Sequence, residues 1–409
     1  MGRAREAAGT ERYEKKREAI LFAAQQILYR RGVKGMTLAD VAAEVGLNAT
    51  SITYYFRKKE DLATACFLAG IQRLEANMID AAQSADVRER LTRALKAFFA
   101  RHRAARLGEE SQIVSFSDMR ALEQPHAEVL NKAFAGMVQK ARALFDGPEL
   151  AHLDRAAKTA RAHLLLEQIF WSAGWLHAYD VEDYPRVLER TTDIFIDGLA
   201  LKGASWCSDA HPVAAAPRAV SSDLSLEDFL AAATQLINKF GHRGASVEKI
   251  SAELNVTKGS FYHHNEAKGD LVESCFMRTH DIMKETQRRA MDESATQWDA
   301  LTRAVNTLVD YQVSPAGPLL RTSILPTLPE PMRTKLTERL NRVVERFAAI
   351  ISDGIAEGSI RAIDPAIAAQ MFKVAINATA DAPSWVRGVT REVAPALYAK
   401  PALFGALAR

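Results

Sequence analysis

The feature that most constrains this 409-residue chain is an internal repeat. Residues 22–67 match residues 231–276 without a gap, at a constant offset of 209 positions. Two glycines, a serine, a lysine, an Asp-Leu pair and a Cys-Phe pair recur at equivalent positions, and the apolar pattern between them is largely kept. Solenoid repeats have periods of only about 20–50 residues. The chain therefore carries two copies of one domain, and what this domain does is most of what the protein does.

Each copy has the pattern of three short helices. In the first copy, apolar residues at helical spacing stop at Gly32, where a glycine can end a helix. Thr37 can cap a second helix, Gly46 allows a sharp turn, and Asn48 can cap a third helix over residues 50–56. The outer face of this third helix carries short polar and aromatic side chains. The pattern predicts a helix-turn-helix, whose last helix enters the major groove of DNA.

The second copy has the same capping and turn positions, with different residues. Ser246 takes the first capping position, and Asn255 takes the turn, where asparagine tolerates left-handed backbone angles. Thr257 can cap a recognition helix that includes residues 258–264. The equivalent cysteines, Cys66 and Cys275, precede core phenylalanines, so we expect both to be buried.

These motifs resemble the TetR family of bacterial transcriptional regulators. Its pattern G-x-x-G-x-[TS]-[LV] is present at residues 32–38 and 241–247, and a lysine and an Asp-Leu pair follow in both copies. The resemblance covers two segments of 46 residues each; the rest fits only as helical sequence of suitable length. It implies an all-α fold of two tandem units, each with a three-helix helix-turn-helix head and a helical ligand and dimerisation body.

The expected domain order follows from the repeat and the composition. A stretch rich in Ala, Pro and Ser without periodicity separates the two units and is interpreted as a linker. Cys207 and His211 stand four apart in it, but further metal ligands are missing nearby, so we expect no metal and no cofactor. The predicted boundaries are a first head at 1–67, a first body at 68–202, the linker at 203–225, a second head at 226–276 and a second body at 277–409.

The last two helices of the first body are predicted near residues 153–178 and 184–201. In proteins of the resembled family, the last two helices of the body form the dimer. The resemblance therefore implies that six residues of these helices lie in a dimer interface: Leu164, Ile169, Phe170, Ile194, Phe195 and Leu199. Ordinary core packing is the equal alternative for them. The second body contains amphipathic helices at 336–355 and 366–378. After Asp381, prolines interrupt the sequence of the second body too often for a long dimerising helix.

The resemblance also implies an effector pocket among the helices of a body. Candidate lining residues in the first body are Phe116, Met119, Phe134, Trp171 and Trp175; those in the second are Tyr311, Met332, Met371 and Trp385. By spacing alone they cannot be separated from core residues, and for any one of them core packing is the commoner interpretation. The identity of the effector is not predicted.

Local charge separates the two heads, whereas the whole chain has a formal charge of only +3. Residues 1–67 contain 12 Lys and Arg against 8 Asp and Glu, a net charge of +4. Residues 221–276 contain 5 against 8, a net charge of −3. Because neutralising phosphates dominates affinity for DNA, we expect the first head to bind DNA more strongly. For the second head, DNA binding and its loss remain equal alternatives.

The expected DNA contacts divide into two kinds. In the first head, phosphate contacts are predicted for Thr37, Tyr55 and Lys59, and base contacts for Ala49, Thr50, Ser51, Thr53 and Tyr54. In the second head, Lys258 or His263 could reach guanine from the helix that also carries Gly259 and Ser260. Contacts of the second head with the DNA backbone are predicted for Ser246, Tyr262, His264 and Lys268. For each of them the alternative is an ordinary solvated residue.

The sequence thus predicts a ligand-responsive transcriptional regulator, a repressor that leaves its double-stranded operator when a small molecule binds. A ligand-sensing or partner-binding protein that has lost DNA binding is the alternative. An enzyme is disfavoured, because His263 and His264 project about 100° apart on a helix and no catalytic constellation accompanies them. No segment suits a membrane span or a secretory signal, so the cytoplasm is expected.

Two assemblies fit this prediction. Two chains paired through their first bodies would read a palindrome with their first heads. One chain folded as a pseudo-dimer would read a non-palindromic operator with both heads. The charge difference between the heads and the long helix pair at 153–201 favour the homodimer.

Overall fold

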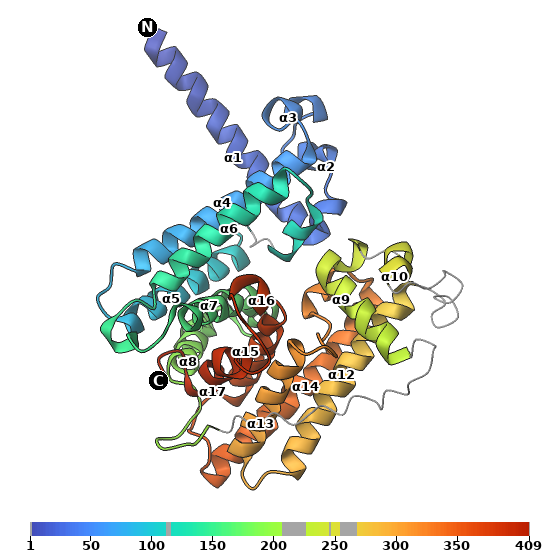
Figure 1. The fold of residues 1–409 in the computed structure, drawn as a ribbon. Helices are drawn as coiled ribbons and strands as arrows, with labels where there is room; N and C mark the ends of the chain where they lie inside the picture. Colours follow the sequence, from blue (N-terminus) through green and yellow to red (C-terminus); the bar gives the residue numbers. More distant parts are fainter. Residues whose placement is uncertain (1, 112–115, 207–225, 245–246, 254–267, 409) are drawn as a thin grey trace. The chain divides into compact units, whose positions relative to one another are not determined.

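The computed structural model describes residues 2–111, 116–206, 226–244, 247–253 and 268–408. Within these ranges the regular structure is helical (Figure 1), apart from one isolated antiparallel bridge between Ala200 and Ile360. This confirms the predicted all-α fold. Contacts divide the chain into two compact units, the first with residues 1–83 and 96–140, the second with residues 84–95 and 141–409.

The first unit contains the first head. Its helices are α1 (Gly2–Gly35), α2 (Leu38–Glu44), α3 (Ala49–Tyr55) and α4 (Lys59–Ala81), followed by the 3-10 turn η1 (Phe116–Ala121) and most of α6 (His126–Ala143). Helix α5 (Val87–Arg106) has residues in both units.

Short-range hydrogen bonds set the helix boundaries of the first head. The Asp40 amide donates to the hydroxyl of Thr37 at 3.1 Å, and the Ser51 amide donates to Oδ1 of Asn48 at 2.7 Å. Both residues are therefore N-caps, as predicted. At Gly32 (φ 64°, ψ 178°) the backbone leaves the helical region, so the long first part of α1 ends there, as predicted, and only a short stretch follows up to Gly35. Because this backbone angle is left-handed, glycine is the residue it favours.

The second unit contains all described residues from Ala141 onward. Its long helices are α7 (Arg155–Leu176), α8 (Tyr184–Asp197), α9 (Leu226–Gly244), α12 (Lys268–Asp292), α13 (Gln297–Gln312), α14 (Glu330–Glu357) and α15 (Pro365–Thr379). Its shorter elements are η2 (Pro148–Leu150), η3 (Val181–Asp183), α10 (Val247–Glu253), η4 (Thr322–Thr327), α16 (Ala382–Trp385), the π-helical turn η5 (Pro395–Ala399) and α17 (Lys400–Phe404). The described residues after Asp381 form only short elements, as predicted.

The repeat is preserved in structural detail. Helix α9 bends at Gly241 (φ 72°), the counterpart of Gly32. The Cys66 thiol donates to the carbonyl oxygen of Leu21 at 3.8 Å, and the equivalent Cys275 thiol donates to that of Leu230 at 3.7 Å. Both cysteines are fully buried, which confirms the prediction.

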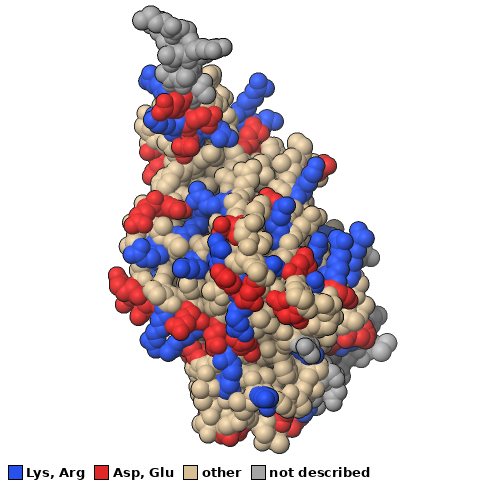
Figure 2. Space-filling model, turned by 90° about the vertical axis from the view of Figure 1, so that its left-hand side faces the viewer, with Lys and Arg blue, Asp and Glu red and all other residues tan. Residues whose placement is uncertain are grey.

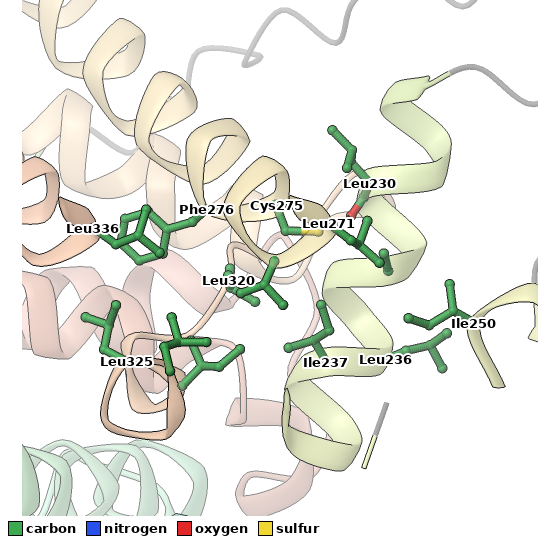
Figure 3. Close-up of a cluster of buried hydrophobic side chains, with 14 of the residues drawn as sticks. Leu230, Leu236, Ile237, Ile250, Leu271, Cys275, Phe276, Leu320, Leu325 and Leu336 are labelled. Atoms are coloured by element: carbon green, nitrogen blue, oxygen red, sulfur yellow. Dashed lines mark hydrogen bonds between the residues drawn. The ribbon is translucent and has the colours of Figure 1, made fainter. Parts of the chain in front are cut away.

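One apolar core joins the second head to the second body. Leu236 and Ile237 of α9 and Ile250 of α10 belong to the same buried cluster as Phe276 of α12 and Leu320 (Figure 3). Leu325 of η4 and Leu336 of α14 extend the cluster away from the head. The first helix of the second head is thus packed directly on the body, and a change in one alters the packing of the other.

The last two helices of the first body pack against the second body of the same chain. Helices α7 and α8 both contact α15, and α7 also contacts η5 and α16 (Figure 1). Leu164, Ile194 and Phe195, all predicted interface residues, line a small cavity together with Met371 and Phe372 of α15. Of the other predicted interface residues, Ile169 and Leu199 are buried and Phe170 is half-buried.

Buried polar groups of α7 cross this contact. Arg161 Nε donates to the carbonyl oxygen of Ala406 at 2.8 Å, and His163 Nδ1 lies 2.9 Å from the Tyr398 hydroxyl. Burial lowers the pKa of Arg161 to about 10 and that of His163 to about 4. Because an unpaired buried polar group is costly, these bonds make the pairing specific as well as apolar.

The backbone also approaches closely at this contact. Leu199 N donates to the carbonyl oxygen of Leu403 at 2.7 Å, and Ala406 N donates to that of Phe195 at 2.8 Å. A Cβ added to Gly198 would lie 2.3 Å from the carbonyl carbon of Phe404, and glycine is therefore required there.

In the described ranges, no helix combines the length and the apolar character needed to cross a membrane.

Candidate nucleic-acid interface

The candidate interface is built on α3 of the first head. Ile52 is fully buried and anchors the helix to the head. Tyr54 is 76% exposed, although it is a large aromatic residue. The other predicted base-contact residues are also accessible: Ala49, Thr50 and Thr53 are exposed, and Ser51 is half-buried. The helix therefore presents the predicted residues outward on a fixed backbone.

Three tyrosines gather at this helix. Tyr13 of α1 stacks on Tyr55 with ring centroids 4.8 Å apart, and its ring meets that of Tyr54 edge-on at 6.0 Å. Arg17 of α1 lies over the ring of Phe56, 5.6 Å from its centroid. Tyr13 is not among the residues predicted from the sequence, because nothing in the spacing of residues 13 and 54 indicates that they meet. Such aromatic contacts restrict the orientation of Tyr54 and Tyr55.

Thr37 has a local structural role. Its hydroxyl accepts from the Asp40 amide and donates to Oδ2 of Asp40 at 2.7 Å. This bond, together with the Arg31 guanidinium 3.4 Å from Oδ1, lowers the pKa of the exposed Asp40 carboxyl. A phosphate contact by Thr37 remains a prediction.

Lys59 stands at the start of α4. The first turn of this helix is fixed by Asp61, whose Oδ2 accepts from the Lys58 amide at 3.0 Å. His126 Nε2 lies 2.9 Å from Oδ1 of Asp61, and this bond is the main reason why the pKa of Asp61 is lowered. Lys59 is half-buried. An ammonium group at a helix N-terminus is well placed to meet a phosphate, because the amide groups of the first turn also favour anions.

On one face of the molecule, charge is mixed rather than concentrated. On the face drawn in Figure 2, Lys and Arg alternate with Asp and Glu. This agrees with the formal charge of +3 and with the expectation that a basic DNA-binding surface has to be local.

Most of the predicted contacts of the second head lie outside the described residues, namely Ser246, Lys258, Gly259, Ser260, Tyr262, His263 and His264. Lys268 is the first residue of α12, and only its backbone is described. Described parts of this head are α9, α10 and the start of α12, which have their counterparts in α1, α2 and α4.

The candidate effector residues of the first body are divided between the two units. In the first unit Phe116 packs against Phe67 and Phe134, with centroid distances of 6.5 and 5.8 Å, and Met119 is half-buried. In the second unit Trp175 is buried against Tyr179, while Trp171 Nε1 donates to Glu167 at 2.8 Å. The aromatic contacts support a packing role for Phe116, Phe134 and Trp175. Their part in an effector pocket remains a prediction.

Known proteins resemble the chain in sequence and in structure. Over 125 residues the chain is 26% identical to the transposon Tn10 TetC protein of Escherichia coli, a match that covers 30% of this chain and 62% of that protein. The structure of AibR in complex with isovaleryl coenzyme A and operator DNA matches with 22% identity and a TM-score of 0.36, over 43% of this chain and 96% of AibR. The regulator PfmR from Thermus thermophilus matches with 18% identity and a TM-score of 0.36, over 43% of this chain and 92% of PfmR.

The family described as bacterial regulatory proteins, tetR family, matches the chain twice, at residues 20–66 and 229–275. These two segments coincide with the two copies of the internal repeat. The chain therefore carries, in tandem, two copies of the N-terminal unit of the TetR family of bacterial regulatory proteins.

Proposed function

We propose that the protein is a repressor that binds operator DNA through its first head and is released by a small-molecule effector. The observation that carries the proposal is the outward face of α3, where a 76% exposed tyrosine, Tyr54, is held beside Tyr13 and Tyr55. A solvent-exposed aromatic residue held in place is suited to contact with a base edge or a sugar. The net charge of +4 in residues 1–67 supplies attraction to phosphates.

We further propose that one chain forms the pseudo-dimer that acts on DNA. The support is the packing of α7 and α8, the last two helices of the first body, on α15 of the second body. This packing favours the pseudo-dimer over the homodimer that the charge difference and the long helix pair favour in the sequence, because residues expected to bind a second chain are covered within one chain. The operator should then lack two-fold symmetry, since the two recognition helices differ in sequence.

Binding of the purified protein to DNA from upstream of its own gene tests the regulator proposal. The double variant Tyr54→Ala/Lys59→Ala should abolish a footprint that the wild type produces and that weakens as salt increases. Lys132→Ala, which removes a lysine from an exposed position on α6, is the control and should leave the footprint unchanged. Absence of any footprint with the wild type would refute the proposal.

The second candidate function is that of a ligand-sensing or partner-binding protein that no longer reads DNA. The net charge of −3 in residues 221–276 favours a loss of DNA binding by the second head. Tyr262→Ala/Lys268→Ala in the same footprint experiment tests whether the second head has lost DNA binding. If the second head binds DNA, this variant should erase one half of the protected site; an unchanged site would assign DNA binding to the first head alone.

A further inference from the structure

The N-terminal part of α1 continues beyond the head to which the helix belongs. Among the described side chains of α1, Ile20 is the first that is fully buried, yet the helix begins at Gly2 (Figure 1). In the second copy, α9 begins at Leu226, the counterpart of Arg17 at the offset of 209 positions. The turns of α1 before Ile20 are therefore an extension that the core of the head does not require. We name residues 2–19 the extension.

Aromatic contacts fix the extension to the recognition helix α3. Tyr13 stacks on Tyr55, with ring centroids 4.8 Å apart, and meets the ring of Tyr54 edge-on at 6.0 Å. The Arg17 guanidinium lies over the ring of Phe56, 5.6 Å from its centroid. Because Tyr13 and Arg17 are four positions apart, they occupy one face of the helix. This face holds the extension beside the C-terminal end of α3, where Tyr54 is exposed.

The charges of the extension are separated on two edges of the helix. Arg12 and Lys16 are four positions apart and therefore lie one turn from each other on the same edge. Glu11, Glu14 and Glu18 follow one another at spacings of three and four and lie on the opposite edge. Lys16 is half-buried, and the other four side chains are exposed. We name the edge with Arg12 and Lys16 the basic edge.

The two cations of the basic edge have no acidic partner. Neither Arg12 nor Lys16 has an Asp or Glu three or four positions away in either direction, and within the described part of the chain neither forms an ion pair. By contrast, Nζ of Lys15 lies 2.7 Å from Oε1 of Glu11. Like charges four positions apart on a helix repel each other, and an anion bound between them would remove this repulsion.

We propose that the extension is a second DNA-binding element of the first head, in which Arg12 and Lys16 bind phosphates beside the half-site that α3 reads; the proposal rests on the DNA binding by the first head proposed above. Four residues rise by about 6 Å along a helix, so the two cations can meet neighbouring phosphates of one strand. Tyr13 and Arg17 hold the extension against α3, and the edge with the three glutamates is turned away from the phosphates.

The second copy lacks the residues of this element. Serines stand at the positions equivalent to Arg12, Tyr13 and Lys16, and a leucine stands at the position equivalent to Arg17. Uncharged side chains do not neutralise phosphates, so they supply none of the counterion-release contribution to affinity. The additional contact should therefore occur at one end of the operator only, on the side of the first head.

The salt dependence of operator binding tests the basic edge. Fluorescence anisotropy with the DNA fragment that the wild type protects gives the slope of log affinity against log salt concentration. Arg12→Gln and Lys16→Gln should each reduce the magnitude of this slope by about 0.9, and the double variant should reduce it by about 1.8 and bind about tenfold or more weakly at low salt. Because glutamine is a good helix former, circular dichroism should show unchanged helix content.

Lys15→Gln is the matched control, because it removes the same charge from the same turns of α1 where the ammonium is paired with Glu11. It should leave the slope unchanged. Arg12→Lys keeps the charge and should also retain the slope. An unchanged slope in Arg12→Gln/Lys16→Gln, or an equal loss in Lys15→Gln, would overturn the proposal.

Hydroxyl-radical footprinting at saturating protein locates the contact. Arg12→Gln/Lys16→Gln should lose protection of backbone positions at one end of the operator, while protection within the half-site read by α3 remains. Equal loss at both ends would refute the one-sided placement. If the wild type leaves no footprint, the DNA-binding proposal fails together with this one; if the wild type binds and the double variant behaves like it, only the role of the basic edge fails.

Discussion

The side-chain amide of Gln168 in α7 donates a hydrogen bond of 2.9 Å to the carbonyl oxygen of Met371 in α15, and both residues are buried. The bond connects the first body to the second over a sequence separation of 203 residues. Because a buried amide without a partner costs about 1–3 kcal/mol, the bond specifies how the two helices pair. Residues of α7 that the resemblance predicts for a dimer interface are packed here against the same chain.

The contact between Gly198 and Phe404 predicts a test of this pairing. Gly198→Ala should lower the free energy of unfolding by about 3 kcal/mol or more, because the new Cβ would meet the backbone of Phe404 at a left-handed φ of 66°. Urea unfolding followed by circular dichroism measures it. Gly203→Ala is the matched control, since Gly203 has a similar φ of 88° and no atom within 4 Å of the added Cβ. It should cost about 1–2 kcal/mol, and equal losses for the two variants would contradict the close pairing.

The stacking of Tyr13 on Tyr55 predicts an effect on DNA binding without a direct contact. Tyr13→Ala should weaken binding about three- to tenfold, because an aromatic pair contributes about 0.5–1.5 kcal/mol to the placement of its partner. Tyr13→Phe should keep the wild-type affinity. Tyr29→Ala, on an exposed position of the same helix, should also have no effect. Fluorescence anisotropy with labelled operator DNA gives the affinities, and a loss of binding in Tyr13→Phe as large as in Tyr13→Ala would show that stacking is not the cause.

Burial of the two equivalent cysteines predicts slow modification. Burial raises the pKa of Cys66 to about 12 and that of Cys275 to about 11. In a Cys207→Ser background, iodoacetamide at pH 8 should therefore modify the folded protein at least a hundredfold more slowly than the protein in urea, since the thiolate is the reactive form. Mass spectrometry of the modified peptides follows each cysteine separately. Rapid labelling of either residue in the folded protein would mean that its head opens readily.

The lowered pKa of Lys373 predicts a pH-dependent gain in stability on its removal. The ammonium has a pKa of about 8 in the folded state, whereas the ordinary pKa of a lysine is 10.5, so between these two pH values the unfolded chain binds more protons. Stability of the wild type therefore rises with pH across this window, and the lysine destabilises the fold most fully below pH 8. Lys373→Met should add about 1–3 kcal/mol at pH 7 and progressively less towards pH 10.

Denaturant unfolding at pH 7 and pH 10 measures this gain. Lys284→Met, on an exposed position of α12, is the control and should change the stability little at either pH. A gain of Lys373→Met that is independent of pH would mean that improved apolar packing, not the charge, is responsible.

The sequence predicted well what depends on short-range interactions. Thr37 and Asn48 cap α2 and α3 through bonds to residues three positions away, so a local pattern is sufficient to find them. The repeat itself predicted that Cys66 and Cys275 occupy equivalent buried positions. The prolines after Asp381 likewise predicted that the described residues there form only short elements.

Long-range partners were beyond the sequence. Leu164 and Met371 are both apolar residues on helices, and nothing in their spacing indicates that they face each other. Lys373 follows the apolar pair Met371-Phe372 and looks like a lysine on the polar side of an amphipathic helix. Only the position of α15 between two bodies shows that this side of the helix faces a cavity. Tyr13 was missed for the same reason, because its partners are about forty residues away.

The stoichiometry of the protein on its operator tests the central claim, that one chain is its own dimer. Native mass spectrometry of the complex with an operator fragment, together with light scattering of the free protein, measures it directly. A single-chain pseudo-dimer should have a free mass of 45.1 kDa over a wide concentration range and should bind as one chain per operator. A free mass of about twice this value, with two chains on each operator, would contradict it and restore the homodimer.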